Sequence, residues 1–279
     1  MATEIEETTT ARVNGVRLAY EFHGTGGVPL VMVHGSLLSR RNWDLVVPHL
    51  EDSFRVLSYD RRGHGESERP SGQGSVREDI ADLAALIEHL ELAPAWVAGQ
   101  SFGGEIALAL AGERPDLIRG IIAHEPGPIT LVADDPALVP TLEAFARTNA
   151  AVTKRIASGD NAGAAKQFIE EALGQGVWAR LPRWFQQDTI ENVPTYLDEA
   201  NDPGIEDFDL DRIRGFTRPT LLTIGEESPP AFAPVVDKFA QALPSAEVRH
   251  FSGAGHVIQV DKPKDFAEAI LDFVRRHTA

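Results

Sequence analysis

Two residues of this chain have the types that nucleophilic catalysis needs, and both stand among glycines. Ser101 lies in the stretch Gly99-Gln100-Ser101-Phe102-Gly103, after an apolar run and before a stretch rich in alanine and leucine. A serine hydroxyl is a poor nucleophile until a base takes its proton, and histidine suits that work near neutral pH. His256 lies in the glycine-rich stretch "GAGHVIQV". The pair predicts acyl transfer, with Ser101 as nucleophile and His256 as general base.

The glycines around Ser101 predict how the chain exposes its hydroxyl. A serine between a strand and a helix must sit on a sharp turn to rise above the edge of the sheet. Gly99 and Gly103 leave room for that turn because neither has a Cβ, and Gly104 allows close packing of the helix. The helix N-terminus also carries a partial positive charge, close to where an oxyanion would develop.

Short apolar runs and helical patterns alternate along the chain and must position these residues. Residues 12–23 read as an antiparallel hairpin around Asn14-Gly15. Further strands are predicted at 29–35, 54–60, 95–101, 118–125, 219–225 and 247–253, and helices at 76–91, 102–113 and 263–277. This alternation predicts an α/β protein with a mostly parallel, doubly wound sheet and right-handed crossovers.

One interval breaks the alternation. Between His124 and Pro219 the chain has no convincing strand, but it has several helix-like stretches. We therefore expect a core domain made of residues 1–127 and 216–279, with residues 128–215 forming a helical cap over one end of the sheet.

Four stretches give the chain a resemblance to a known family from about residue 12 to the end. They are "MVHGSLLS", "YDRRGHGES", "GQSFGGE" and "GAGHVIQVDKP", and together they resemble the α/β-hydrolase fold. The resemblance implies the chain order serine, acid, histidine, which His256 matches. It also implies that the loop at His34-Gly35 forms an oxyanion hole, in which the N–H of Ser36 pairs with that of Phe102. Leu37 replaces Ser36 if the loop is shifted by one residue, and His34 itself is expected to be structural.

The acid that should orient His256 is missing from its usual place. The resemblance places it just after "LLTIG", where this chain has Glu226, Glu227 and Ser228, and the usual aspartate falls on or near the serine. Serine carries no charge and cannot stabilise an imidazolium in the same way. The remaining candidates are Glu226 or Glu227, Asp261 after His256, and Glu125 at the end of the strand predicted at 118–125.

Glu125 is the acid that we favour, on structural grounds first. The ends of adjacent parallel strands meet, so Glu125 should lie beside the serine turn. A carboxylate ending such an apolar run is costly unless it is paired, and protonated His256 would pair with it. Side chains alternate along a strand, so we expect only one of His124 and Glu125 to face this edge. A solvated glutamate at a strand exit is the plain alternative.

The resemblance supports the same choice. Haloalkane dehalogenases and zearalenone-type lactone hydrolases include members with a glutamate acid after the sixth strand. The lactone hydrolases also use a serine nucleophile, and the chain is similar to them and to related esterases. Dehalogenases and epoxide hydrolases have an aspartate nucleophile, so Ser101 argues against both of those reactions.

These residues predict a serine hydrolase that cleaves a carboxylic ester or lactone through an acyl-enzyme intermediate, without a cofactor. Two alternatives stay open: C–C bond hydrolysis or cofactor-free perhydrolysis at the same site, and a ligand-binding receptor of the same fold. Apolar residues that are expected to line a pocket for an apolar small-molecule substrate are Leu37, Trp178, Trp184, Phe185 and Tyr196. Aromatic residues at helical spacing also fit the core of the cap.

Composition excludes several other classes of function. Lysine and arginine number 26 and aspartate and glutamate 42, so the formal net charge of −16 disfavours nucleic acid and anionic membranes as partners. The chain has no cysteine, which excludes thiol chemistry, and its dispersed histidines indicate no metal site. No secretory signal or membrane-spanning run is apparent, and we expect a cytoplasmic protein whose first ten residues are partly disordered. The sequence does not decide the oligomeric state.

Overall fold

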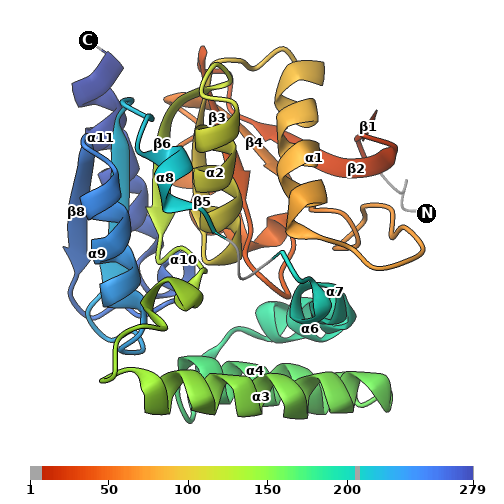
Figure 1. Ribbon diagram of the computed structural model, residues 1–279. Coiled ribbons are helices and arrows are strands. Elements are labelled where there is room, and N and C mark those ends of the chain that lie inside the picture. The colour runs from red at the N-terminus through yellow and green to blue at the C-terminus, as the bar shows by residue number, and fades with distance from the viewer. Residues whose placement is uncertain (1–7, 205–207, 279) are drawn as a thin grey trace.

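The computed structural model describes residues 8–204 and 208–278, and these form one eight-stranded sheet with helices on both faces (Figure 1). The strands are β1 (Thr10–Val13), β2 (Val16–His23), β3 (Val28–Val33), β4 (Phe54–Tyr59), β5 (Ala95–Gln100), β6 (Ile118–His124), β7 (Thr220–Gly225) and β8 (Ala246–Phe251). Their order is β1-β2-β4-β3-β5-β6-β7-β8. β1 and β2 pair antiparallel, as do β2 and β4, and the remaining pairs are parallel. The predicted α/β class with a mostly parallel, doubly wound sheet is confirmed.

The two faces of the sheet have separate hydrophobic cores. Helices α1 (Val76–His89), α2 (Phe102–Glu113) and α9 (Phe232–Ala242) cover one face. Helix α11 (Pro263–Thr278) covers the other, together with the short helices η1 (Arg40–Trp43) and η2 (Val47–His49). Within β3, Val31 and Val33 belong to the first core while Leu30 and Met32 belong to the second. This two-residue alternation in a nearly all-apolar run is what a doubly covered strand requires.

Helices fill the interval between β6 and β7. They are η3 (Ile129–Val132), α3 (Val139–Ala157), α4 (Asn161–Leu173), α5 (Val177–Arg180), α6 (Arg183–Asn192), η4 (Val193–Thr195), α7 (Tyr196–Asn201) and α8 (Leu210–Ile213). Figure 1 shows α3, α4, α6 and α7 as a separate layer beyond one end of the sheet. We call residues 128–215 the helical insertion. Its division from the core at 127/128 and 215/216 stays a prediction, and the prediction of disorder near the N-terminus concerns mainly residues 1–7, outside the described residues.

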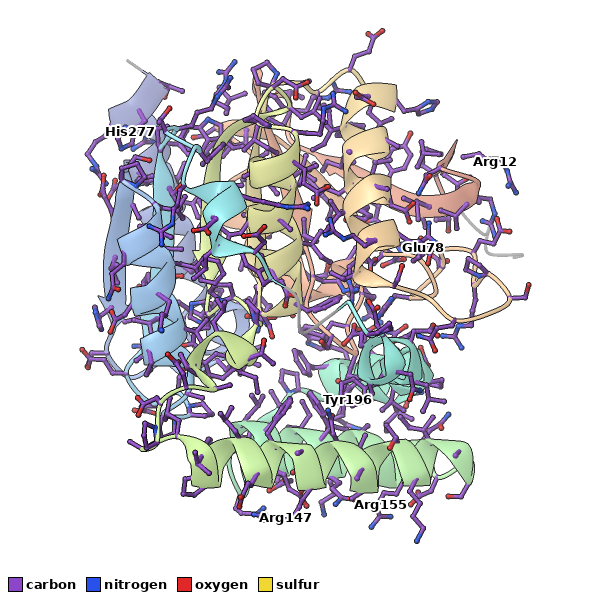
Figure 2. All side chains as sticks on the ribbon, viewed as in Figure 1. Arg12, Glu78, Arg147, Arg155, Tyr196 and His277 are labelled. Carbon is purple, nitrogen blue, oxygen red and sulfur yellow. The ribbon has the colours of Figure 1, made fainter. Side chains whose placement is uncertain are left out.

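The outer hairpin of the insertion, α3 and α4, is amphipathic. Arg147 and Arg155 of α3 project away from the rest of the molecule, whereas Tyr196 of α7 lies on the inner side of the hairpin (Figure 2). Val152 and Ile156 on the inner face of α3 are buried against α4 and Tyr196. The apolar stripe therefore holds the layer together, as its helical spacing predicts. No helix in the described part of the chain is both long and apolar enough to cross a bilayer.

Candidate active site

Ser101 occupies the turn between β5 and α2. Its backbone φ is +54°, in the left-handed region that residues other than glycine rarely adopt. Its N–H donates to the carbonyl of His124 at 2.9 Å, and its own carbonyl accepts from the N–H of Gly104 at 2.9 Å. A Cβ on Gly99 would lie 2.3 Å from the carbonyl oxygen of Gly103, so only glycine fits at this position. The strand, the strained serine and the helix together have the geometry of a nucleophile elbow.

The carboxylate of Glu125 contacts the ring of His256. Its Oε2 lies 2.6 Å from Nδ1 of His256, and its Oε1 accepts from the N–H of Gly225 at 2.7 Å and from the Ser228 hydroxyl at 2.5 Å. Glu125 is completely buried. Burial alone would raise the pKa of its carboxyl group, but the hydrogen bond to His256, the neighbouring His124 ring and the Ser228 hydroxyl lower that pKa to about 2. Glu125 is therefore ionised at neutral pH and can orient and stabilise a protonated His256.

His124 lies next to Glu125 but, as a neutral ring, does not compete with His256 for an ion pair with that carboxylate. Its Nδ1 contacts the Thr223 hydroxyl at 2.9 Å and its Nε2 contacts the carbonyl of Gly255 at 3.3 Å. Since a carbonyl only accepts, Nε2 carries a proton, and Nδ1 accepts from the Thr223 hydroxyl when the ring is neutral. Burial lowers the pKa of His124 to about 4. The carboxylate of Glu125 is thus left to His256.

The prediction that only one of His124 and Glu125 would face this edge is wrong. Nε2 of His124 lies 3.8 Å from Oε1 of Glu125, and the His124 and His256 ring centroids are 6.3 Å apart. The reason is the backbone at Glu125, whose φ of +43° ends the strand alternation at that residue. The turn brings two successive side chains to the same place.

Two further contacts hold the His256 loop and its imidazole ring in place. The side-chain amide of Gln100 donates to the carbonyl of His256 at 3.1 Å, which ties the loop to the residue before Ser101. The Phe232 ring of α9 stacks on the imidazole with centroids 4.2 Å apart. No hydrogen bond joins the Ser101 hydroxyl to His256 within the described residues. Such bonds are often long without substrate and tighten when it binds.

The other candidate acids lie elsewhere. Glu226 and Glu227 are exposed, and neither side chain contacts His256 among the described interactions. Asp261 accepts from the N–H of Gly255 at 2.9 Å, so it supports the backbone of the loop rather than the imidazole. The structure therefore brings Glu125 and His256 together and leaves these three carboxylates apart from the ring.

The proposed oxyanion loop packs directly on the serine turn. A Cβ on Gly35 would lie 3.2 Å from Cβ of Ser101, and one on Gly103 would lie 2.2 Å from the carbonyl oxygen of Val33. In the described part of the chain, neither the N–H of Ser36 nor that of Phe102 has a hydrogen-bond partner. Two free donors beside a nucleophile are what a tetrahedral intermediate needs. The N–H of Leu37 is equally free, so pairing alone does not choose between Ser36 and Leu37.

The residues predicted to contact substrate pack within the helical insertion. Leu37, Phe185 and Tyr196 are buried, and Trp178 and Trp184 are partly buried against the same clusters. Tyr196 also hydrogen-bonds Asn149 of α3. Their contact with a substrate stays a prediction.

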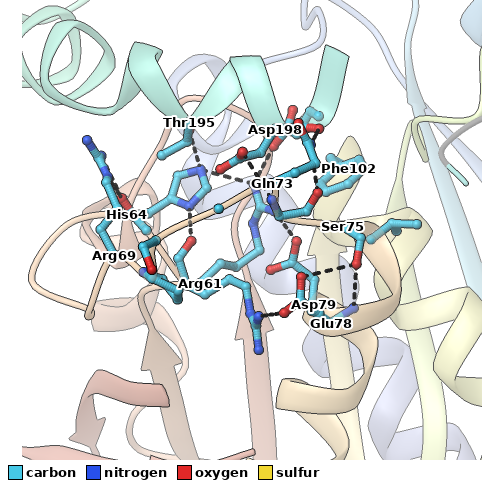
Figure 3. Close-up of a pocket in the computed structure, with 18 residues that line it drawn as sticks. Arg61, His64, Arg69, Gln73, Ser75, Glu78, Asp79, Phe102, Thr195 and Asp198 are labelled. Carbon is cyan, nitrogen blue, oxygen red and sulfur yellow. Dashed lines mark hydrogen bonds and ion pairs between the residues drawn. The ribbon is translucent and has the colours of Figure 1, made fainter. Parts of the chain in front are cut away.

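A crevice adjoins Phe102 rather than lying over Ser101 and His256. It is bounded by the loop from Arg61 to Ser75, the start of α1 and the Thr195–Glu199 segment (Figure 3). At its base Arg61 pairs with Asp79 at 3.0 Å. No cluster of potential metal ligands occurs in residues 8–204 or 208–278.

Comparison with known proteins identifies the family. Residues 28–263 match the family model described as alpha/beta hydrolase fold. The chain belongs to this family. The suspected α/β-hydrolase resemblance is therefore confirmed, and the fold and the order of Ser101, Glu125 and His256 along the chain agree with it.

Relatives of this alpha/beta hydrolase differ in what they do. A dihydrolipoyllysine-residue acetyltransferase component of an acetoin cleaving system from Pseudomonas putida is 28% identical over 92% of this chain, which spans 66% of that protein's length. A solved thermophilic esterase from Thermogutta terrifontis superposes with a TM-score of 0.80 at 24% identity, covering 98% of this chain and all of that one. Est816, described as an N-acyl homoserine lactone degrading enzyme, superposes with a TM-score of 0.76 at 25% identity, over 95% of this chain and all of its own.

Three contacts of this alpha/beta hydrolase were not predicted from its sequence: the Ser228 hydroxyl on Glu125, the Phe232 ring on His256, and the Gln100 amide on the His256 carbonyl. Gln100 precedes the predicted nucleophile Ser101, and Ser228 lies where the acid was expected, so the sequence drew attention to both places. Nothing in the sequence marked Phe232, because its contact with His256 depends on how the loop after β7 folds back.

Proposed function

We propose that the protein hydrolyses a carboxylic ester or a lactone through an acyl-enzyme intermediate. The observation that supports this most is the 2.6 Å contact of Glu125 with His256 at the edge of the sheet where the strained turn presents Ser101. Glu125 is ionised and buried, His124 is neutral, and His256 is the imidazole placed to receive a proton. This arrangement suits a serine nucleophile assisted by a base and an orienting acid.

In the proposed reaction Ser101 Oγ attacks the carbonyl carbon of the substrate while its proton moves to His256. The negative oxygen of the tetrahedral intermediate accepts hydrogen bonds from the N–H groups of Ser36 and Phe102. The intermediate collapses, and the leaving alkoxide takes the proton from His256. Water then attacks the acyl-enzyme and gives one proton to His256. The second tetrahedral intermediate collapses as the bond between the acyl carbon and Ser101 Oγ breaks, and His256 returns the proton to Oγ as the carboxylic acid leaves. In a lactone the alcohol and the acid remain in one molecule, so the product is a hydroxy acid.

The substrate class is the finer part of the proposal. The apolar side chains of the insertion that pack around Leu37 and Leu38, next to the proposed oxyanion donor, support an apolar acyl or alcohol group. The likeness to a lactone-degrading enzyme at 25% identity supports including lactones. We further propose that the protein acts without a cofactor, without nucleic acid or membrane partners, and in the cytoplasm.

A substrate panel run on wild type and Ser101→Ala tests the proposal. The panel holds p-nitrophenyl esters of increasing chain length, acyl homoserine and aromatic lactones, a vinylogous diketone, and an ester with hydrogen peroxide. We expect ester or lactone turnover in wild type and none above background in Ser101→Ala. Faster turnover of the diketone or of peroxide would favour C–C hydrolysis or perhydrolysis. Negligible turnover with strong thermal stabilisation by a ligand would favour a receptor.

A further inference from the structure

Residues 34–39, which we call the oxyanion loop, pack against the helical insertion. The side chain of Leu37, 1% exposed, packs among residues of α3, α4 and Tyr196. That of Leu38, 5% exposed, packs among residues of α4, α5 and α6. Ser36, the proposed oxyanion donor, comes directly before these two residues. Any displacement of the insertion would therefore pull on the loop.

A carboxylate of the insertion also holds the far side of the loop. Asp188 of α6 is buried and accepts from both the N–H of Ser39, at 3.0 Å, and the Ser39 hydroxyl, at 2.7 Å. Asn192 donates to the same carboxylate at 3.3 Å. Two hydrogen bonds to one residue fix both its backbone and its side chain.

A second carboxylate reaches the near side of the loop through Arg61. The guanidinium Nη2 donates to Glu199 of α7 at 2.8 Å and to the Gly35 carbonyl at 3.3 Å. The backbone N–H of Arg61 donates to Nε2 of His34 at 3.0 Å, which leaves Nδ1 of His34 to donate to the same Gly35 carbonyl at 2.9 Å. Arg61 and Glu199 are 1% and 7% exposed, so their contact is nearly free of solvent.

Fixing the Gly35 carbonyl fixes the direction of the Ser36 N–H. The Gly35–Ser36 bond is trans, because the cis bond of the described chain is Ala93–Pro94. In a planar trans peptide the C=O and the N–H point in opposite directions. Donors on the Gly35 oxygen therefore aim the Ser36 N–H away from Arg61 and His34, and that N–H has no partner within the described residues.

We propose that Glu199 and Asp188 are positioning residues through which the helical insertion aims the oxyanion donor of Ser36. The inference rests on the proposed function, because it assigns that donor to the tetrahedral intermediate. It makes the insertion part of the catalytic apparatus, since the loop takes its reactive geometry only while the insertion is docked.

Glu199→Gln and Asp188→Asn test the proposal by removing each charge at nearly constant shape. The readouts are kcat and KM for an ester and the inhibition constant of phenylboronic acid, whose trigonal boron accepts Ser101 Oγ and presents a tetrahedral anion to the hole. Loss of a whole oxyanion donor costs roughly 10²- to 10³-fold in kcat. For misaimed donors we expect about a tenfold fall in kcat and a similar weakening of the boronate, with KM within about twofold. Ser39→Ala keeps the N–H bond to Asp188 but loses the hydroxyl bond to it, together with the 3.3 Å hydrogen bond that the hydroxyl accepts from the Arg41 N–H. This variant should change both readouts in the same direction by less.

Asp198→Asn is the matched control. Asp198 is also a carboxylate of α7 that binds the core, but it accepts from the N–H of Gly74 at 3.1 Å, outside the oxyanion loop. We expect wild-type kcat and boronate inhibition in this variant. If folded Glu199→Gln, Asp188→Asn and Ser39→Ala all match wild type in both readouts, the inference is wrong while the proposed function stands. A wild type that neither turns over esters nor binds the boronate would overturn the proposed function and this inference together.

Discussion

The Ser228 hydroxyl donates to Oε1 of Glu125 across 2.5 Å, although 103 residues separate them in the chain. Ser228 occupies the place where the family resemblance leads one to expect an aspartate. The serine therefore supports Glu125, the carboxylate that we propose as the acid in place of the expected aspartate. Because Gly225 binds the same oxygen, Oε2 of Glu125 alone faces His256. The orientation of the base thus depends on β6 and on the loop after β7.

We expect Glu125→Gln to lower kcat by roughly 10³- to 10⁴-fold, because the amide can neither stabilise a protonated His256 nor hold its tautomer. KM should change little, since Glu125 lies behind the imidazole. Steady-state kinetics on the best ester or lactone, with a circular dichroism spectrum to verify folding, give the comparison.

Glu226→Gln and Glu227→Gln are the controls for that substitution, because both side chains are exposed. Both should retain near wild-type kcat. A Glu125→Gln enzyme with nearly full activity, beside a large loss in either control, would show that the acid has been assigned to the wrong residue.

Ser228→Ala should have a smaller effect of the same kind. It removes one of the three hydrogen bonds to a buried carboxylate, and a bond to a charged group contributes about 1.5–3 kcal/mol. We expect a kcat three- to tenfold below wild type and a lower thermal midpoint, while Ser228→Thr, which keeps the hydroxyl, should lie between the two. Equal kinetics and equal unfolding curves for Ser228→Ala and wild type would mean that the hydroxyl contributes nothing.

The local pattern of apolar residues predicted most of the strands and helices that hold these residues. The run 118–125 was expected as a buried strand and β6 spans Ile118–His124, and the helix predicted at 102–113 matches α2. Glu125 could be singled out because a charge that ends an apolar strand needs a partner. The backbone turn at Glu125 could not be predicted, because strand periodicity does not reveal where a non-glycine residue adopts a positive φ.

The contacts that were missed depend on distant parts of the chain. Arg61 and Glu199 are 138 residues apart, and Asp188 and Ser39 are 149 apart. Each alone reads as an ordinary charged or polar residue, and only the packing of the insertion on the sheet makes them partners. The predicted substrate contacts share this ambiguity, because an apolar residue in the insertion fits a pocket wall and a packed cluster equally well.

The protein should lose stability on acidification at pH values well above those at which carboxylates usually titrate. Burial lowers the pKa of His124 from 6.5 to about 4 in the folded state. Between pH 6.5 and pH 4 the unfolded chain therefore binds a proton at His124 that the folded protein does not bind. The contribution of His124 is complete above pH 6.5 and is lost as pH falls toward 4, by about 3 kcal/mol in total. Urea unfolding at pH 7, 6, 5 and 4 should show a smaller decline in His124→Asn than in wild type. Parallel curves would contradict the assignment of a neutral, buried His124.

Gly103→Ala should disable the site through packing alone. An added Cβ would lie 2.2 Å from the carbonyl oxygen of Val33 and 2.6 Å from that of His34, and backbone atoms cannot yield as a flexible side chain does. The start of α2 must then move away from the oxyanion loop, which separates the N–H of Phe102 from that of Ser36. We expect a kcat loss of about 100-fold or more and a destabilisation of roughly 1–3 kcal/mol, as for other overpacked cores. Gly215→Ala meets no atom within 4 Å and should behave as wild type in the same kinetic and thermal measurements. A Gly103→Ala enzyme as active and as stable as Gly215→Ala would mean that α2 and the loop tolerate separation.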